Sequence, residues 1–375
     1  MYAPLEYTYG RQVVKILHRY IRNTFLRFFL CGLIFFTGII LITDVFEILP
    51  MLGEKKLPIL TGVIYFVYKI PFVAFLITPV AVLLATISCF SLLLRNSEIT
   101  AMKASGISLY RIISPVLLIA FFISILFMGV NEFLVPVANT KAEYIKKVKI
   151  EGIQEDMRGY NISFRTTGNR FLNIGMIDDI GTEMDGVEIK DYQSDNSISL
   201  RIDAKKAKWI NNQWYLFNGI ERRFSPFGLV ISEERFDKKR LPILETPDEI
   251  QNIISAGKIK TENMNMLELW QSITLLKRSN NGVKDKLVDF YLKTSFPFAS
   301  FIIALLGAAI SLQNAKGAIA AGFGLSIVVS FLYWESIGIG RALGYAGVVP
   351  ALLAAWLANI IFGVVGIFLL GRARG

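Results

Sequence analysis

Residues 81–120 read AVLLATISCF SLLLRNSEIT AMKASGISLY RIISPVLLIA, and they join two long apolar runs through one short polar segment. The polar segment is NSEITAMKASGIS (96–108). Apolar runs of about 20 residues or more cross the ~30 Å hydrocarbon core of a bilayer as helices. The stretch therefore predicts that the chain crosses a membrane, turns through a short polar segment and crosses back.

The same pattern extends over the whole chain of 375 residues, of which 53% are hydrophobic. The apolar residues gather in the first third and the last quarter of the chain, and the middle is polar. This distribution indicates a membrane protein with one domain outside the bilayer. The formal net charge is +10, and many basic residues flank the apolar runs, so membrane topology explains the charge better than nucleic-acid binding does.

Six membrane-spanning helices are predicted, and a polar insertion divides them into two groups. The spans cover residues 24–49, 62–94, 109–134, 291–312, 317–339 and 349–370, with the first closing at Pro50 and the third ending at Pro136. The chain is thus expected to consist of residues 1–136, which include the polar segment, an outer domain at 137–262, a helical connector at 263–288 and the last spans at 289–375. The first apolar run follows a polar and amphipathic segment and has no small-residue cleavage site, so we expect that run to stay in the membrane.

Lysine and arginine residues predict the orientation of the spans, because they favour the cytoplasmic side of a membrane. Their distribution places both termini in the cytoplasm and residues 137–288 outside it. The basic residues on the cytoplasmic side are Arg11, Lys15, Arg19, Arg22, Arg95, Lys103, Arg111, Lys316, Arg372 and Arg374, and those on the opposite side are Lys55, Lys56 and Arg341.

The polar middle of the chain has the signals of an all-β domain. SISLRIDA (197–204) alternates apolar and polar residues, and WINNQWYLFNG (209–219) places an Asn-Asn turn between aromatic segments, as in a hairpin. We predict an antiparallel sandwich or jelly roll with Trp209 and Trp214 in its core. From Met266 to Lys277 the period becomes helical, with an expected apolar stripe of Leu267, Trp270, Ile273 and Leu276.

The polar segment at 96–106 is predicted to be a short helix. Asn96 or Ser97 can cap its first N–H groups, Glu98 suits the positive end of the helix dipole, and Gly106 ends it. Glu98, Met102 and Ser105 are spaced to lie on one face, which suits docking into a groove of another protein. The alternative is a plain capped turn that only joins two spans.

The sequence lacks the residues that several kinds of active site need. His18 is the only histidine and lies in a basic segment, so a histidine metal site or a catalytic triad is not expected. Cys31 and Cys89 both lie in apolar runs, which argues against a disulfide or a metal site. No GxxxxGK[ST] phosphate-binding loop is present, so we expect no cofactor and no ATP hydrolysis by this chain alone.

Several stretches, in order along nearly the whole chain, resemble the LptF/LptG permease family, whose members export lipopolysaccharide from the inner membrane of Gram-negative bacteria. Within the family, SEITAMKASG and the AGVVP turn are more similar to the G branch than to the F branch. The stretches that carry the resemblance are LHRYIRNTFLRFF, NSEITAMKASGIS with LYRI, NEFLVPVANTKAEY, AKKAKWINNQWYLFNG, KTSFPFASFIIALLG and GYAGVVPALLAAWLANIIF.

The resemblance implies a function for the polar segment and a set of partners. In the family this segment is a coupling helix that docks on the ATPase dimer LptB, and Glu98 matches an acidic residue that contacts the ATPase. The resemblance also implies a second permease, LptF, and a periplasmic jelly roll that leads lipopolysaccharide toward LptC and LptA. The expected coupling residues are Glu98, Ala101, Met102, Lys103, Ser105 and Gly106.

The resemblance further implies that spans one and five form the gates of a lipid cavity. The expected gate residues are Phe35, Phe36, Thr37, Ile40 and Asp44 in span one, and Phe323, Phe331 and Trp334 in span five. For each of them, contact with bulk lipid or helix packing is the alternative.

Charged residues near the outer ends of the spans suggest where lipid head groups bind. Asp44, Glu47, Lys69 and Glu335 lie in predicted spans, so they either snorkel to the interface or form a polar rim. The head-group candidates are Lys55, Lys56, Lys69, Lys141 and Arg341. Better-known members of the G branch carry lysines in the outer half of span one, where this chain has Leu41, Asp44 and Glu47.

Three other functions compete with transport driven by a separate ATPase. A non-transporting mechanotransmission or scaffold protein would share the coupling helix and the outer domain, but it usually has four spans. An ion-driven secondary transporter needs ionisable groups near the middle of the bilayer, and the inner halves of these spans hold almost none. An intramembrane enzyme would need catalytic groups that meet at a common depth, and no such pair is evident.

Overall fold

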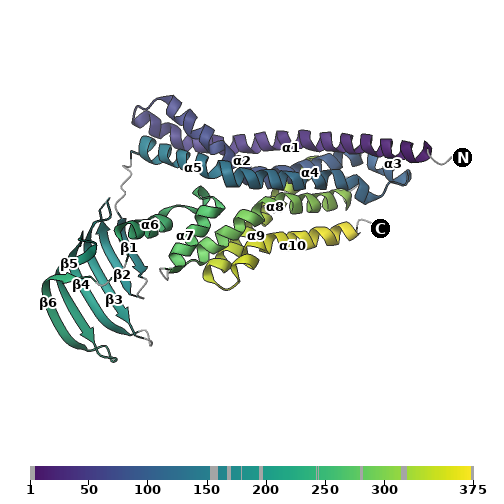
Figure 1. Ribbon diagram of the computed structural model, residues 1–375. Coiled ribbons are helices and arrows are strands. Elements are labelled where there is room, and N and C mark those ends of the chain that lie inside the picture. The colour runs from purple at the N-terminus through teal and green to yellow at the C-terminus, as the bar shows by residue number, and fades with distance from the viewer. Residues whose placement is uncertain are drawn as a thin grey trace. The chain divides into compact units, whose positions relative to one another are not determined.

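The computed structural model describes residues 5–152, 159–166, 170–178, 180–193, 197–241, 243, 245–278, 282–313 and 319–372. The chain forms two compact units, a helical unit of Met1–Glu151 with Leu287–Gly375 and a β unit of Gly152–Lys286. The β unit is thus inserted between two groups of helices that belong to one unit (Figure 1).

Long apolar helices build the first part of the helical unit. α1 (Leu5–Glu54) and α2 (Ile59–Arg95) lie side by side, and the short α3 (Glu98–Ala104) follows them (Figure 1). A third long helix then runs from Leu109 to Ile150. It consists of α4 (Leu109–Gly129), a π-helical turn at Val130–Leu134, α5 (Val135–Tyr144) and a second π-helical turn at Ile145–Ile150.

Two of these helices end later than the sequence predicts. α1 passes through Pro50 and ends at Glu54. The third long helix passes Pro136 and ends at Ile150. Pro136 is tolerated because it stands at the start of α5, directly after a π-helical turn, where its missing N–H removes little α-helical bonding.

Three more helices complete the helical unit: α8 (Lys284–Gln313), α9 (Ile319–Ala346) and α10 (Ala351–Arg372). Among the described residues, five helices are long and apolar enough to cross a membrane. These are Ile16–Glu54, Ile59–Arg95, Leu109–Ile150, Lys284–Gln313 and Ala351–Arg372. They correspond to five of the predicted spans, and α9 is a long helix at the place predicted for the remaining one.

α2 is the central helix of this unit. On one side Ala81, Phe90 and Leu93 share a core with residues of α1, α3 and α4. On another side Leu83 and Ile87 pack with residues of α8, α9 and α10. α2 therefore contacts both groups of helices through its buried side chains.

The β unit contains one antiparallel sheet of six strands in sequence order, followed by two helices. The antiparallel sheet that the sequence predicts between the two groups of membrane helices is therefore confirmed. The strands are β1 (Gly159–Arg165), β2 (Phe171–Ile177), β3 (Glu183–Tyr192), β4 (Ile198–Ile210), β5 (Gln213–Phe224) and β6 (Val230–Arg240), and the helices are α6 (Pro247–Lys258) and α7 (Met266–Arg278), with a 3-10 turn at Thr261–Asn263 between them.

The predicted hairpin forms between β4 and β5. Asn211 and Asn212 have φ angles of 50° and 60°, as a two-residue turn of the primed type requires. Trp209 and Trp214 face each other across the hairpin with ring centroids 5.3 Å apart. Trp214 is 1% exposed and its Nε1 donates a hydrogen bond to the Glu245 carbonyl at 3.0 Å. The prediction of Trp214 as a core residue is confirmed.

The two-sheet arrangement of a sandwich or jelly roll is not what the described strands form. They make a single meander, and the apolar face of the sheet is covered by Ile250, Ile253 and Ile254 of α6. A sheet can bury its apolar face against a helix as well as against a second sheet, and the alternation of residues along a strand does not distinguish the two.

The apolar stripe predicted for α7 is also corrected. Leu267 and Trp270 are 65% and 50% exposed, whereas Leu269, Ile273 and Leu276 are buried. Both sets have helical spacing, so the period alone could not select the buried face; packing against α6 selects it.

Candidate functional site

The polar segment after α2 forms α3, a helix of only seven residues. Gly106, with φ of 80°, follows its end, and the amide of Gly106 donates a hydrogen bond to the Lys103 carbonyl. This is the glycine-terminated helix end that the sequence predicts. The predicted N-cap is wrong, because Ser97 stands at that position with φ of 59° and its side chain makes no capping hydrogen bond.

Two apolar side chains anchor α3 to the membrane helices. Ile99 and Met102 are 1% and 9% exposed, and they pack in the same core as Phe25 of α1, Leu93 of α2 and Ile112 of α4. Met102 therefore points inward and does not share a free face with Glu98 and Ser105 as the sequence suggested. The exposed residues of α3 and of the two residues after it are Thr100, Ala101, Lys103, Ala104, Ser105 and Gly106.

Glu98 links α3 to the neighbouring elements by hydrogen bonds. Its Oε1 accepts from the Tyr20 hydroxyl of α1 at 3.2 Å and from Asn96 Nδ2 at 3.1 Å. These contacts lie at the surface, so the carboxylate remains accessible. α3 is thus fixed to α1, α2 and α4, while its outer face consists of small side chains and one lysine.

The expected gate residues occupy different environments on α1 and α9. Phe35 and Phe331 are 54% and 61% exposed, whereas Thr37 is 9% exposed. Phe36 and Ile40 are half-buried. Trp334 packs edge-on against Phe296 of α8 at 5.8 Å between centroids, so helix packing accounts for its orientation. The side chain of Phe323 lies outside the described residues.

At the end of the helices near the α1–α2 turn, charged side chains pair between helices. Asp44 of α1 forms an ion pair with Lys69 of α2 at 2.6 Å. Glu47, one turn further along α1, forms another with Lys146 of the second π-helical turn, also at 2.6 Å. We name these four residues the turn-end charge cluster.

The other head-group candidates differ in how they are held. Lys141 Nζ lies 5.3 Å from the centre of the Tyr68 ring. Arg341 forms an ion pair with Asp289 at 2.8 Å, and the Tyr345 hydroxyl donates to the same carboxylate at 2.7 Å. Lys55 and Lys56 are exposed in the α1–α2 turn, and neither has an ion pair among the described residues.

Lys146 is absent from the residues that the sequence pointed to. The prediction ended the third span at Pro136, which left Lys146 in the outer domain, far from Glu47. The available signal was the spacing of Asp44 and Glu47 by three residues, which puts two carboxylates on one helix face and calls for basic partners.

A second group of polar residues is buried between α8, α9 and α10. The Tyr333 hydroxyl donates to Asn359 Oδ1 at 2.8 Å, and Asn359 Nδ2 donates to the Ser295 carbonyl at 2.7 Å. The Ser295 hydroxyl in turn donates to the Ala355 carbonyl at 2.8 Å. Tyr333, Asn359 and Ser295 are at most 4% exposed, so these bonds fix three helices to one another in an apolar setting.

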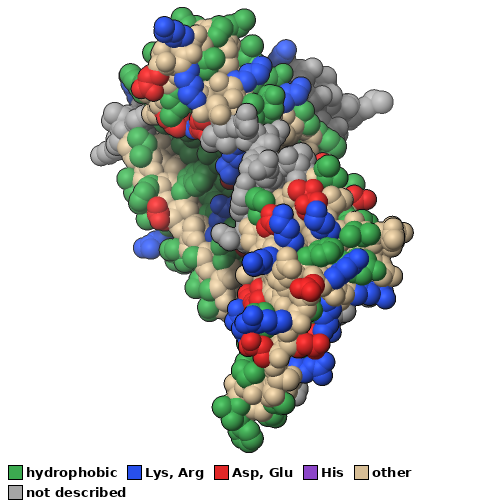
Figure 2. Space-filling model, turned by 90° about the vertical axis from the view of Figure 1, so that its left-hand side faces the viewer, with side chains coloured by type: hydrophobic (Ala, Val, Ile, Leu, Met, Phe, Trp, Pro, Cys, Tyr) green, Lys and Arg blue, Asp and Glu red, His purple; other side chains and the backbone are tan. Residues whose placement is uncertain are grey.

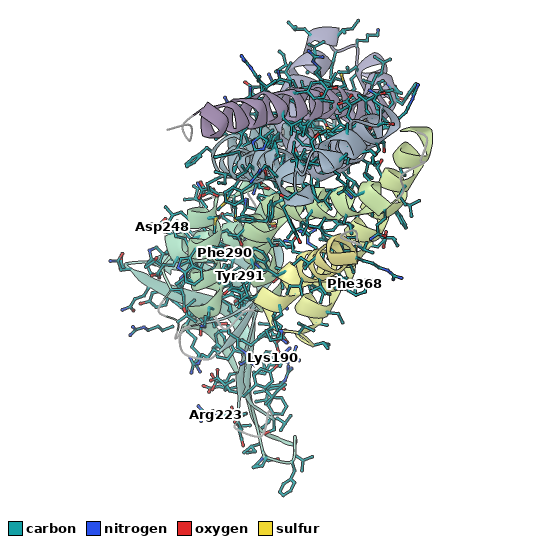
Figure 3. The ribbon with its side chains drawn as sticks, turned by 90° about the vertical axis from the view of Figure 1, so that its right-hand side faces the viewer. Lys190, Arg223, Asp248, Phe290, Tyr291 and Phe368 are labelled. Atoms are coloured by element: carbon teal, nitrogen blue, oxygen red, sulfur yellow. The ribbon has the colours of Figure 1, made fainter. Side chains whose placement is uncertain are left out.

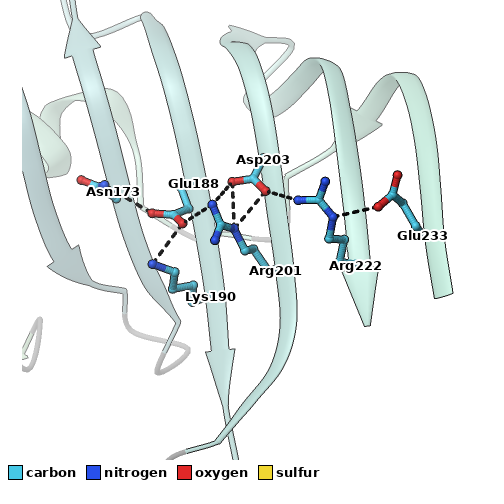
Figure 4. Close-up of polar contacts among 7 residues, drawn as sticks. All are labelled: Asn173, Glu188, Lys190, Arg201, Asp203, Arg222 and Glu233. Carbon is cyan, nitrogen blue, oxygen red and sulfur yellow. Dashed lines mark hydrogen bonds and ion pairs between the residues drawn. The ribbon is translucent and has the colours of Figure 1, made fainter. Parts of the chain in front are cut away.

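The face of the sheet opposite the apolar core carries a ladder of charged side chains (Figure 4). Arg201 bonds to Asp203 at 2.9 Å and to Glu188 at 2.9 Å, and Arg222 bridges Asp203 and Glu233. Lys190 of this face and Arg223 are labelled in Figure 3, and Figure 2 shows acidic and basic side chains interspersed over the β unit. Because the charges satisfy one another, this face has little free charge to attract a ligand.

Two carboxylates of the sheet titrate below their ordinary range. Burial by itself raises the pKa of Glu221, but the hydrogen bonds and charges of Lys239 and Arg223 outweigh burial and lower it. For Glu188 burial is likewise outweighed, by Lys190, Asn173 and Arg201, and the pKa is lowered. The hydrogen bond and charge of Asp203, with Glu188, raise the pKa of Arg201. Within the ladder, these contacts favour the charged forms of Glu188 and Arg201.

Comparison with known proteins adds two findings. The family model for the lipopolysaccharide export system permease LptF/LptG matches residues 19–372 of the chain. The lipopolysaccharide export system permease protein LptG of Haemophilus influenzae is 21% identical to the chain over 373 residues, which cover 96% of this chain and 100% of that relative.

Proposed function

Because this chain belongs to the LptF/LptG family of lipopolysaccharide export permeases, we propose that it works as the permease subunit of an ATP-driven transporter. It is a multi-pass protein of the inner membrane and a transport subunit rather than an enzyme. In the proposed reaction it extracts lipopolysaccharide from the inner membrane and passes it toward the outer membrane. The observation that carries the proposal is the family match, which extends over both groups of membrane helices and the inserted β unit.

We propose that α3 couples the membrane helices to an LptB-type ATPase dimer. A docking helix can transmit force only if it is held firmly by the helices that must move. The burial of Ile99 and Met102 in the shared core supports this role, and so do the bonds of Glu98 to Tyr20 and Asn96. The exposed face with Ala101, Lys103, Ser105 and Gly106 is then the surface offered to the ATPase.

We propose further that α1 and α9 form lipid gates with a second permease of the F type, and that the turn-end side faces the periplasm. The exposed side chains of Phe35 and Phe331 suit contact with acyl chains. Lys55, Lys56, Lys69, Lys141 and Arg341 are the basic residues proposed to meet the phosphorylated head group. In this proposed orientation both termini lie in the cytoplasm, and the β unit delivers lipid to LptC and through it to LptA.

The first test identifies the partners. The tagged chain is purified from native membranes in a mild detergent, and the co-purifying proteins are identified by mass spectrometry. A Walker-motif ATPase together with a second permease supports the proposal. Recovery of the chain alone, in a detergent that keeps other transporters assembled, contradicts it and favours a scaffold protein.

The second test separates coupling from folding. Glu98→Ala removes the carboxylate, and Ala101→Trp places a bulky ring on the exposed face of α3. Both variants are expected to lose lipopolysaccharide release from membrane vesicles by at least about tenfold while keeping their thermal unfolding temperature. Glu54→Trp, on the exposed last turn of α1 at the other end of the helix, is the matched control and should transport normally.

A further inference from the structure

We propose that Lys69 and Lys146 form a binding site for lipid-borne phosphate, and that Asp44 and Glu47 occupy this site when no lipid is bound. The inference rests on the proposed function, because lipopolysaccharide supplies the phosphate. It adds to that function a binding site whose access two carboxylates control. The sequence suggested Lys69 alone as one of several head-group candidates and gave no role to Lys146 or to the two carboxylates as competitors.

The four residues come from three separate elements and meet at one place. Asp44 and Glu47 are three residues apart on α1, so both carboxylates lie on one face of that helix. Lys69 reaches Asp44 from α2, and Lys146 reaches Glu47 from the second π-helical turn, each at 2.6 Å. Glu47 also interacts electrostatically with Lys69, so the two lysines act on the same small region.

The lysines are held on a rigid base. Tyr65 is 3% exposed, and its hydroxyl accepts a hydrogen bond from Lys69 Nζ at 3.1 Å. Ile48, Leu52 and Ile145 pack around Tyr65 in one apolar cluster beneath the charges. The Lys69 ammonium is therefore positioned by a buried tyrosine, and one apolar cluster joins the three elements that carry the charges, which pre-organises the site for a ligand.

The chemistry of the cluster favours exchange over permanence. A lysine ammonium is a compact charge with three donors, and a phosphate group offers more charge and more acceptor oxygens than a carboxylate does. The side chains of Lys69 and Lys146 are 22% and 28% exposed, so an incoming head group can reach them. When phosphate replaces the carboxylates, the lysines keep their charge-assisted hydrogen bonds and the carboxylates gain water.

The backbone beneath Lys146 adds an independent indication. Lys146 lies in a π-helical turn, a conformation that is rare and is frequently found at functional sites.

The experiment measures lipid binding to the complex purified with its partners and reconstituted in nanodiscs. Diphosphoryl lipid A and lipid A stripped of its phosphates are titrated, and binding is read by native mass spectrometry. The Asp44→Asn, Glu47→Gln variant is expected to bind diphosphoryl lipid A about three- to tenfold more tightly, because the competing carboxylates are gone. The Lys69→Gln, Lys146→Gln variant is expected to bind it at least about tenfold more weakly.

Several controls give each outcome a meaning. Glu143→Gln should leave the affinity unchanged, and none of the variants should alter binding of the dephosphorylated lipid. Lys69→Arg should keep most of the affinity, which separates loss of charge from loss of folding, and Asp44→Asn alone should show part of the gain if the double variant is unstable. In a competition experiment, millimolar inorganic phosphate is added to the complex with bound lipid. Displacement of the lipid shows that the phosphate group alone is recognised, and no displacement shows that the whole lipid is recognised.

If the Asp44→Asn, Glu47→Gln variant binds diphosphoryl lipid A no more tightly than the wild type, the inference is wrong. The two ion pairs then have only a structural role. Absence of lipid A binding to the wild-type complex has a different meaning, because it contradicts the proposed function itself. The two failures are distinguished by the wild-type titration, which is made first.

Discussion

Two regions of the helical unit are held together by different polar contacts. Buried hydrogen bonds join α8, α9 and α10, whereas ion pairs join α1 to its neighbours near the α1–α2 turn. In the buried group around Asn359, the contacts between α8, α9 and α10 are hydrogen bonds of neutral groups, and Tyr333 and Ser295 are each 1% exposed. The ion pair of Arg341 with Asp289 also joins α9 to α8, but it lies outside this buried group. Near the turn the contacts are ion pairs of partly exposed side chains, such as Lys69 with Asp44.

The difference follows from what each environment permits. A neutral hydrogen bond inside apolar surroundings has no water to replace it, so breaking it leaves two unsatisfied groups. An ion pair that touches water can exchange its partner at small cost. The first arrangement fixes helices for the life of the fold, and the second suits a place where a charged ligand enters and leaves.

The largest predicted effect tests how tightly α9 and α10 are joined. A Cβ at Gly340 would lie 2.4 Å from the Ala354 carbonyl oxygen, a backbone atom that cannot move aside without displacing α10. Gly340→Leu is therefore expected to destabilise the protein by at least about 3 kcal/mol, seen as a lower thermal unfolding temperature in detergent. Gly338→Leu is the matched control, because nothing lies within 4 Å of its Cβ position.

A smaller effect is expected at the buried hydrogen bonds. Asn359→Leu keeps the side chain near its size but removes the acceptor of Tyr333 and the donor to Ser295, at a cost of about 1–3 kcal/mol. Adding Tyr333→Phe removes one orphaned group and should restore part of that loss in the same unfolding assay. Tyr333→Phe alone is measured as well. If it lowers the free energy of unfolding by the same amount in the wild type and in the Asn359→Leu variant, the two residues are not coupled.

The buried carboxylate of the sheet is an intermediate case and predicts a pH dependence. Glu221 is 5% exposed and pairs with Lys239 at 2.5 Å, and its pKa lies below the ordinary value of 4.5. Its contribution to stability is present above pH 4.5 and is lost as the pH falls through the lower folded-state pKa. Hydrogen exchange of β5 and β6 across this range measures the loss, and Glu221→Gln should flatten the pH profile.

The smallest effect is expected at the turn-end charge cluster. Asp44→Asn breaks one partly exposed ion pair and should lower the free energy of unfolding by about 1 kcal/mol or less. If Asp44→Asn lowers the free energy of unfolding by more than about 3 kcal/mol in the same thermal assay, this ion pair is as strong as the buried contacts of α8–α10. A lipid phosphate would then be unable to replace Asp44 easily.

The sequence predicted those features that depend on neighbouring residues. Apolar runs gave the membrane helices, the Asn-Asn pair gave the hairpin between β4 and β5, and Gly106 gave the end of α3. Each signal is local, because hydrophobic length, a turn with positive φ and a glycine after a helix act within a few residues. Several stretches in order along the chain, among them the motif around Glu98, supplied the family resemblance, which the family match then confirmed.

The sequence by itself thus determined that this chain is a membrane protein with an inserted antiparallel β unit, and it pointed to α3 as the segment to test. Only the tertiary structure decided that Met102 faces the core, that α6 covers the sheet and that Lys146 meets Glu47. These contacts join residues far apart along the chain, and which partner each side chain finds depends on how whole helices and strands pack. No periodicity or local motif carries that information.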